Sequence, residues 1–216
     1  MNFLEISRQI GSKLENIPKI WDGKKAIMGM KEAGYAHWRQ MEWMGFYFQF
    51  LCEKYLSGIM DIPGPKYGRV AFDGFKEIPW DFKARAIDTK RHDVIVNDSQ
   101  ATADAVKEYK QIGLILAQVN AVYNDENRTF QKWHENLKGG KSDYTTERIR
   151  RGAPSRIRKT SCELQRISYI RIADDTLVKC GSFQKGFRNA DGSPRKPKVK
   201  INLRELDEIE VHSVAF

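Results

Sequence analysis

The sequence predicts an α/β fold, more closely described as α+β, and three observations lead to that prediction. Apolar and polar residues alternate through 80–86, which is typical of a half-buried strand. Segments typical of a strand, a helix and a second strand follow one another between 93 and 123. A stripe of apolar residues at helical spacing runs through 30–57.

The composition is that of a soluble globular protein. The 216 residues are enough for one hydrophobic core, or for one core and a small subdomain. No apolar run approaches the roughly 18 residues of a membrane helix, and the first residues lack a secretory signal pattern, so we expect no membrane partner. The three cysteines are odd in number and form no CxxC pair, which argues against structural disulfides and a zinc site. These features favour a cytoplasmic protein.

The formal net charge is +9, which favours a polyanionic partner. Many basic proteins bind no polyanion, however. The distribution of the basic residues along the chain therefore decides between these two interpretations.

Two helices are expected before the first strands. Residues 1–25 suggest a short amphipathic helix and a loop, and residues 30–57 predict the longest helix of the chain, which Gly58 ends. Glu42 lies beside the apolar stripe of that helix, where a charge is costly unless it is paired or bound to a metal. The stripe recurs at steps of three and four residues: Trp38, Met41, Gly45, Phe48, Cys52 and Tyr55.

Two short strands are predicted after the Pro- and Gly-rich loop at 61–65. Apolar residues between 70 and 75 mark the first strand. The second runs through 80–86, and Pro79 stands at its start, where a strand tolerates proline.

A crossover unit is predicted next. It comprises a strand at 93–96, a helix at 100–111 after the capping residues 97–99, and a strand at 114–123. Such a unit predicts parallel pairing of its two strands with a right-handed connection. Later segments predict a helix at 129–137, a hairpin formed by 164–172 and 176–183 around Asp174 and Asp175, and a strand at 198–203.

The strand at 80–86 places a carboxylate beside an ammonium group. Asp81, Lys83 and Arg85 share one face, because side chains at i and i+2 of a strand point the same way, and Asp73 belongs to the preceding strand. Two carboxylates can hold a hard divalent ion such as Mg²⁺. The ion polarises a phosphoryl oxygen and lowers the pKa of a bound water, while a lysine positions or deprotonates that water or offsets developing negative charge. The combination is typical of metal-assisted phosphodiester hydrolysis.

The spacing of Asp73, seven residues, then Asp81-Phe82-Lys83 resembles the PD-(D/E)XK nuclease superfamily, which includes most type II restriction endonucleases. The resemblance implies a restriction-endonuclease-like mixed central sheet flanked by helices, dependence on Mg²⁺ and cleavage of DNA. It also implies that Asp73, Asp81 and the carbonyl of Phe82 are metal ligands and that Lys83 is the catalytic lysine. In several nucleases of this family a helical glutamate reaches the metal site, and Glu42 is the candidate for that catalytic role.

An acid two residues before a lysine is a weak signal by itself. The same spacing occurs at 22–24, 88–90 and 108–110, but only 81–83 lies in an alternating strand with an acid on the strand before it. The alternative interpretation is a surface strand in which Asp81 and Lys83 form a solvated pair of little energetic value.

Basic residues are concentrated after residue 138. The segment 147–160 carries six basic residues and one acid, and most of the six are arginines, whose planar guanidinium groups suit phosphates and the major-groove edge of guanine. We therefore expect DNA contacts in this segment, while a nonspecific basic surface is the alternative. The expected DNA-binding residues are Arg148, Arg150, Arg151, Ser155, Arg156, Arg158 and Lys159.

We expect two regions within one compact domain. Residues 1–140 form the N-terminal helices and the nuclease core, and residues 141–216 form a basic, β-rich subdomain that contacts DNA. The sequence thus favours a Mg²⁺-dependent endonuclease that cleaves double-stranded DNA at a specific short sequence, as type II restriction enzymes do. Such an enzyme is usually a homodimer and has a cognate DNA methyltransferase in the same system, which it does not bind. The alternatives are a repair or nicking nuclease of the same superfamily and a non-catalytic basic nucleic-acid-binding protein.

Overall fold

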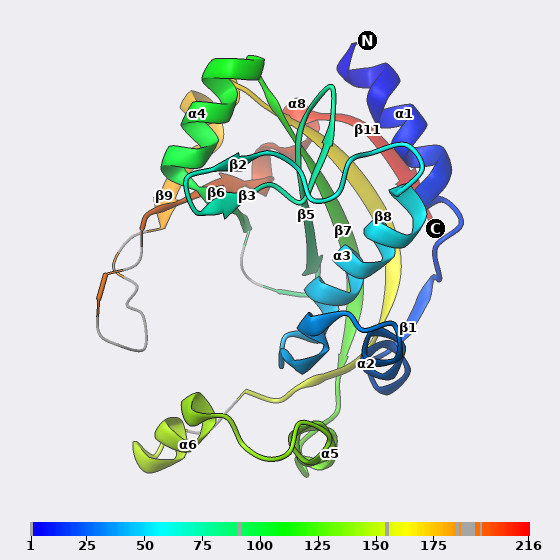
Figure 1. Ribbon diagram of the computed structural model, residues 1–216, viewed down its shortest axis with the longest axis vertical. Helices are drawn as coiled ribbons and strands as arrows, with labels where there is room; N and C mark the ends of the chain where they lie inside the picture. Colours follow the sequence, from blue (N-terminus) through cyan, green and yellow to red (C-terminus); the bar gives the residue numbers. More distant parts are fainter. Residues whose placement is uncertain (1, 90–91, 154–155, 185, 187–192, 195) are drawn as a thin grey trace.

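A curled mixed sheet forms the centre of the protein, with helices on both sides (Figure 1). The computed structural model describes residues 2–89, 92–153, 156–184, 186, 193–194 and 196–216. The strand order is β1-β8-β7-β5-β4, and β11 also pairs with β8. β5 and β7 are parallel, and the other pairs are antiparallel. The strands are β1 (Ile20–Asp22), β4 (Gly74–Lys76), β5 (Ile78–Ala86), β7 (Ile112–Tyr123), β8 (Lys159–Ile172) and β11 (Glu210–Ala215).

Two smaller sheets lie beside the main one. The three-stranded sheet has the antiparallel order β6-β10-β9, and a two-stranded sheet pairs β2 with β3. Their strands are β2 (Lys66–Tyr67), β3 (Val70–Ala71), β6 (Asp93–Asp98), β9 (Gly181–Gln184) and β10 (Lys198–Asn202).

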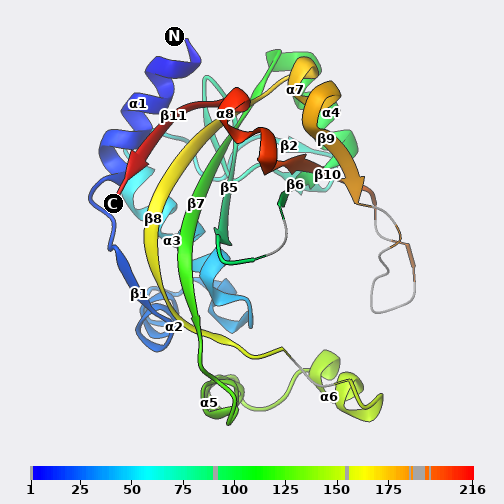
Figure 2. The same ribbon diagram turned by 180° about the vertical axis from the view of Figure 1, so that it is seen from behind.

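Three N-terminal helices cover one side of the main sheet, and the three-stranded sheet with α4 lies on the other (Figures 1 and 2). The first group is α1 (Phe3–Leu14), α2 (Gly23–Glu32) and α3 (Trp43–Leu56), with the short helix η1 (Ala36–Arg39) between α2 and α3. The remaining helices are α4 (Ser99–Tyr109), α5 (Thr129–Leu137), α6 (Asp143–Arg150), α7 (Asp174–Cys180), η2 (Leu203–Glu205) and α8 (Leu206–Ile209).

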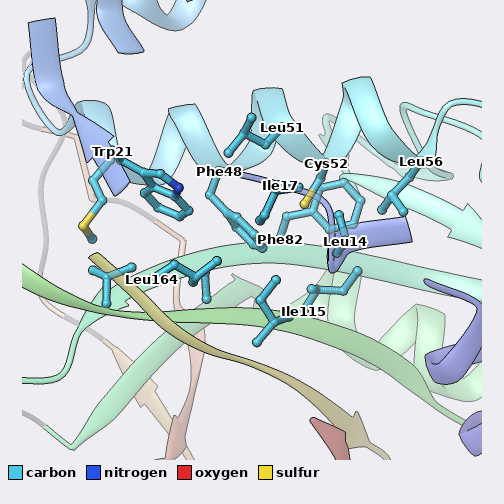
Figure 3. Packing of buried hydrophobic residues seen from close by; sticks show 14 of the residues in the cluster. Leu14, Ile17, Trp21, Phe48, Leu51, Cys52, Leu56, Phe82, Ile115 and Leu164 are labelled. Atoms are coloured by element: carbon cyan, nitrogen blue, oxygen red, sulfur yellow. The ribbon is translucent and has the colours of Figure 1, made fainter. Parts of the chain in front are cut away.

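The central strands are buried on both faces. Figure 3 shows Phe48 and Leu51 of α3 above Phe82 of β5 and Ile115 of β7, within one hydrophobic cluster. The alternate residues of β7, such as Leu114, belong to a second cluster, which is formed with β6, β10 and α4. Because both faces of β7 are covered, its apolar residues form a nearly continuous run, as in other doubly covered strands.

The predicted single helix over 30–57 is wrong, because two breaks divide this segment. α2 ends at Glu32, and Gly34 adopts a left-handed conformation with φ +71° that favours glycine and terminates the helix. η1 follows, and α3 begins only at Trp43. The aromatic stripe continues through these breaks, and for this reason the spacing resembles that of one long helix.

Two further predictions about strand pairing are corrected. The expected parallel pair of the crossover unit does not form, because β6 pairs antiparallel with β10 while β5 occupies the parallel position beside β7. The expected hairpin after 172 is also wrong, because α7 covers Asp174–Cys180. Asp174 and Asp175 stand in the first turn of this helix, where negative charge interacts favourably with the helix dipole.

The strands of the expected C-terminal β-rich region are divided between the two larger sheets. β8 and β11 belong to the main sheet, while β9 and β10 pair with β6 in the smaller one. The predicted helix over 129–137 and the predicted strand near 198–203 are present as α5 and β10. The basic segment therefore comes from the connection between β7 and β8, and this connection also contains α5 and α6 (Figure 2).

Cys52, Cys162 and Cys180 are all buried, and each is a free thiol. Within the part of the chain that is described, no helix combines the length and apolar character needed to cross a bilayer.

Candidate active site

Asp73, Asp81 and Lys83 meet beside the hairpin that β4 and β5 form. Gly74 pairs with Trp80 in this hairpin, so Asp73, one residue before β4, lies opposite Asp81 in β5. Trp80 and Phe82, on either side of Asp81, pack into the core. The predicted half-buried strand is corrected here, because Asp81 on the opposite face is buried as well.

The ammonium group of Lys83 lies between the two carboxylates. Its Nζ is 3.3 Å from Oδ2 of Asp73 and 3.5 Å from Oδ1 of Asp81. The side chain of Asp81 is only 2% exposed, whereas those of Asp73 and Lys83 are 24% and 25% exposed. One acid is therefore sealed in the protein, while the other acid and the lysine remain accessible from solvent.

The carboxylate of Asp81 has one partnered oxygen and one without a partner. Oδ1 accepts a hydrogen bond from Nδ2 of Asn97, at the end of β6, over 3.2 Å. Oδ2 is buried and has no hydrogen-bond partner among the described residues. An unpaired buried carboxylate oxygen is costly, and native proteins keep such groups mainly where they serve a bound ion or a reaction.

The carboxylate of Asp73 is held from two elements. Oδ2 accepts the backbone N–H of Phe82 over 2.7 Å, and Oδ1 accepts from Nε2 of Gln49 in α3 over 3.1 Å. In an extended strand the N–H and C=O of one residue point to the same side. The carbonyl of Phe82 therefore faces the side on which Asp73 lies, beyond the last residue of β5 that pairs with β4.

The pKa values of Asp81 and Lys83 are both raised, for different physical reasons. Burial raises the pKa of Asp81 to about 7, with the ammonium of Lys83 opposing and the charge of Asp73 adding to the increase. Burial alone would lower the pKa of Lys83, but the carboxylates of Asp81 and Asp73 outweigh it and the pKa is raised. Lys83 is therefore an ammonium ion at neutral pH.

The donor set at this site suits a hard cation. The described residues contain no group of three or more His, Cys, Asp or Glu side chains that could hold a metal. The oxygens of Asp73, the unpartnered Oδ2 of Asp81 and the carbonyl of Phe82 nevertheless form an all-oxygen set, which is what Mg²⁺ prefers. These residues fit the ion that the sequence resemblance implies.

Glu42 does not occupy the expected position within a helix. It is the N-cap residue of α3, its side chain is 71% exposed, and its carboxylate pairs with Arg158 and Lys159 at 3.4 Å each. The residue of α3 that contacts an acid of the site is instead Gln49, which lies seven residues, or about two turns, further along.

A series of adjoining grooves connects this site with the basic segment. One groove, of about 340 Å³, is lined by Gln49, Lys83 and Lys159 and by Glu42. Glu42 also lines two neighbouring grooves of about 550 and 630 Å³, and Arg156 and Arg158 line both of these. Arg148 lines the largest of the three.

Four of the seven predicted DNA-binding residues thus line these grooves, whereas Arg150 and Arg151 are not among their lining residues. Arg150 and Arg151 lie at the exposed end of α6, where both pair with Glu147 at 2.8 and 2.6 Å. Ser155 lies outside the described residues.

Sequence reasoning missed Asn97 and Gln49. Asn97 stands in the capping cluster before α4, so it was interpreted as a helix start only. Gln49 is half-buried in α3, and its contact with Asp73 depends on how this helix packs against β5. The sequence contains no signal for that contact.

Comparison of the chain with protein-family models, with curated proteins and with solved structures finds no match.

Proposed function

We propose that the protein is a Mg²⁺-dependent endonuclease that hydrolyses double-stranded DNA at a specific short sequence, with a restriction-endonuclease-like fold. The observation that carries this proposal is the convergence of two carboxylates and a lysine within 3.5 Å, at one end of grooves lined by arginines. Neither half of this arrangement would suggest the function alone. Together they support the proposal of phosphate chemistry beside a surface that binds phosphates.

Asp73, Asp81 and the carbonyl of Phe82 would hold the metal ion. Bound Mg²⁺ supplies a Lewis acid that polarises a phosphoryl oxygen and lowers the pKa of a bound water. The protein orients this donor set through Gln49 and Asn97, which each donate a hydrogen bond to one of the carboxylates.

Lys83 is proposed as the catalytic lysine. Its ammonium lies within 3.5 Å of both carboxylates, beside the residues proposed to hold the metal. The ammonium can donate to a phosphoryl oxygen and offset the negative charge that develops in the transition state.

DNA binding is assigned to four basic residues that line the grooves adjoining Lys83: Arg148, Arg156, Arg158 and Lys159. Cleavage of both strands at a symmetric site requires two such centres, so we propose a homodimer. A cytoplasmic location and a cognate methyltransferase that protects host DNA belong to the same proposal.

A plasmid assay tests the proposal. Purified protein is incubated with supercoiled plasmid and Mg²⁺, and the wild type is compared with Asp81→Asn and Lys83→Met. Each substitution should lower the cleavage rate by about 10³-fold, because it removes a ligand or the charge that the transition state requires. Discrete linear fragments indicate a site-specific enzyme that breaks both strands.

The matched controls use another acid and lysine with the same spacing. Glu108→Gln and Lys110→Met change the same charges at the end of α4, and both should cleave as the wild type does. Accumulation of nicked circles without linear DNA would favour a nicking nuclease of the same superfamily. Intact plasmid at all Mg²⁺ concentrations would leave the non-catalytic nucleic-acid-binding protein as the better interpretation.

A further inference from the structure

An exposed carboxylate occupies the middle of the basic grooves. Glu42 places Oε1 at 3.4 Å from Nη1 of Arg158 and Oε2 at 3.4 Å from Nζ of Lys159. The Glu42 side chain is 71% exposed, whereas the side chains of Arg158 and Lys159 are only 13% and 20% exposed. The two cations are thus held by the protein, while the anion that bridges them faces solvent.

The position of the two cations is well defined. Lys159 begins β8, and its ammonium lies 5.7 Å from the centre of the Tyr123 ring at the end of β7, within the range of a cation–π contact. The side chain of Arg158 lies in the wall shared by two of the grooves. A guanidinium and an ammonium that converge on two oxygens of one anion form an arrangement that also suits phosphate.

The carboxylate is a weak occupant of this position. An ion pair with an exposed partner contributes only about 0–1 kcal/mol, because water competes for both charges. Glu42 also makes no capping hydrogen bond to α3, so its side chain is not fixed by the helix. A phosphate of a nucleic acid could therefore displace it, and the same groove continues to Lys83.

We propose that Arg158 and Lys159 form a binding site for a second backbone phosphate, on the strand whose scissile phosphate lies at Lys83, and that Glu42 occupies this site in the free protein. Glu42 is then an internal competitor that weakens binding to any nucleic acid that does not place a phosphate there. The identity of the strand rests on the proposed function, but the phosphate site itself does not.

The first test uses inorganic phosphate as the probe, at constant ionic strength and without metal. Titration calorimetry of the full chain compares the wild type with Glu42→Gln, which keeps the shape of the side chain and removes its charge. We expect phosphate to bind about five- to tenfold more tightly to the variant, since a neighbouring like charge is lost. Asp207→Asn is the control, because it changes the net charge equally at an exposed position in α8.

A double substitution asks whether Glu42 acts through its partners. In a Lys159→Gln background, Glu42→Gln should improve phosphate binding less than it does in the otherwise unchanged protein, because only Arg158 of the two cations remains. Equal effects of Glu42→Gln and Asp207→Asn in the otherwise unchanged protein would overturn the inference, and so would a Glu42→Gln effect that persists unchanged without the charge of Lys159. Thermal unfolding of each variant establishes that the comparison is made on folded protein.

The second test replaces phosphate by a duplex oligonucleotide, in the Asp81→Asn background and in EDTA, so that cleavage plays no part. Glu42→Gln should again tighten binding about five- to tenfold, for the same electrostatic reason. Tighter phosphate binding without tighter duplex binding would overturn the assignment to a backbone phosphate. Because neither measurement depends on cleavage, a wild type that leaves plasmid intact would refute the proposed nuclease and leave this site standing.

Discussion

At the scale of single residues, the candidate site depends on unequal burial of two acids. Asp81 is enclosed and has a carboxylate oxygen without a partner among the described residues, while Asp73 is partly open and bonded to both α3 and β5. This difference means that Asp81 is positioned by the fold itself. Asp73 is positioned by hydrogen bonds from the Phe82 backbone and from the side chains of Lys83 and Gln49, and the Gln49 side chain can be removed without changing the charge of the site.

Removal of the Gln49 side chain should therefore weaken the metal site without unfolding the protein. In Gln49→Ala the Oδ1 atom of Asp73 loses its donor, so the carboxylate gains rotational freedom. We expect the Mg²⁺ concentration for half-maximal cleavage to rise about tenfold, as is usual when an outer partner of a metal ligand is lost. The measurement is cleavage rate against Mg²⁺ concentration.

Gln100→Ala is the control for that prediction, because it removes an amide–carboxylate hydrogen bond to Asp104 on the exposed side of α4. Its Mg²⁺ requirement should equal that of the wild type. An unchanged requirement in Gln49→Ala would mean that Asp73 does not need α3 to hold its orientation.

The residues of the site were predictable to different degrees. The local pattern of β5 was sufficient for Asp81 and Lys83, because alternation within one strand determines which side chains share a face. Asn97 and Gln49 were not predictable, because their contacts depend on how β6 and α3 pack against β5. No pattern within either segment carries that information.

At the scale of elements, the contact between β5 and β7 supports the site. Gly113 of β7 pairs with Trp80 of β5, and a β-carbon at this glycine would clash with the indole ring. The parallel pairing continues from there through Asp81 and Lys83. The glycine thus lets the two strands approach at the residue that precedes the acid.

Two glycine substitutions should accordingly have opposite effects on stability. Gly113→Ala should lower the free energy of unfolding by about 1–3 kcal/mol, because the added methyl group overpacks the core against Trp80. Gly29→Ala in α2 should raise it by about 0.5–1 kcal/mol, because its β-carbon meets no neighbour within 4 Å and alanine favours the helix. Denaturant unfolding measures both, and equal stability of the two variants would contradict the packing described for β5 and β7.

His134 ties α5 to the segment before α3, and the burial of its imidazole, which outweighs the opposing hydrogen bond to Trp38, should make the free energy of unfolding depend on pH. Nε2 lies 2.9 Å from the carbonyl oxygen of Trp38, and since a carbonyl only accepts, this nitrogen carries the proton. Burial lowers the pKa of His134 to about 4, with the charges of Lys138 and Arg158 contributing and Glu135 opposing. The neutral form is therefore the one that fits the fold.

The sign of the effect follows from linkage. Between pH 6.5 and about 4 the unfolded chain binds a proton that the folded protein excludes, so the free energy of unfolding falls as the pH is lowered through this range. The loss attributable to His134 should be roughly 2 kcal/mol. His134→Gln should remove that part of the pH dependence, whereas His92→Gln, at an exposed position, should retain it. Urea unfolding at pH 7 and pH 5 makes the comparison.

Element prediction succeeded where one segment contains its own signal. The alternation of β5 and the amphipathic pattern of α5 are complete within their own residues. The prediction of one helix over 30–57 failed because the aromatic stripe continues across two breaks in the helix. The first break is at Gly34, whose left-handed conformation ends α2. The prediction of the pairing of β6 failed because the two partner strands lie far apart in the sequence, and no local pattern identifies β10 as the neighbour of β6.

At the scale of the whole molecule, the two proposed activities are assigned to different parts of the main sheet: the acids to β5 and the residue before β4, and the arginines to the connection between β7 and β8. β7 and β8 pair along their full length, and their central parts belong to the core. The connection between them carries α5, α6 and the basic segment beyond the end of the sheet (Figure 1). The acids thus lie beside the core, while the arginines extend from its end.

The salt dependence of DNA binding should report on the exposed arginines. Arg156→Ala removes a side chain that lines two grooves, whereas Arg8→Ala removes an exposed arginine of α1. If Arg156 contacts a phosphate, its loss should reduce the slope of log affinity against log salt by about 0.9. Fluorescence anisotropy with a labelled duplex in EDTA measures the slope, and identical slopes for both variants would remove Arg156 from the interface.

The length of β7 also determines the spacing between the strand positions beside Lys83 and Lys159. Leu116 lies beside Lys83, and Tyr123, seven residues later, lies beside Lys159, so strand geometry sets a spacing of about 23 Å along the chain. Inserting two residues into both β7 and β8 would lengthen the spacing between Leu116 and Tyr123 by about 7 Å and keep every side chain on its own face of the sheet. Inserting one residue would instead move the following side chains to the opposite face. For the proposed endonuclease, such insertions would change the distance between Lys159 and the candidate active site in steps of roughly two base pairs of DNA.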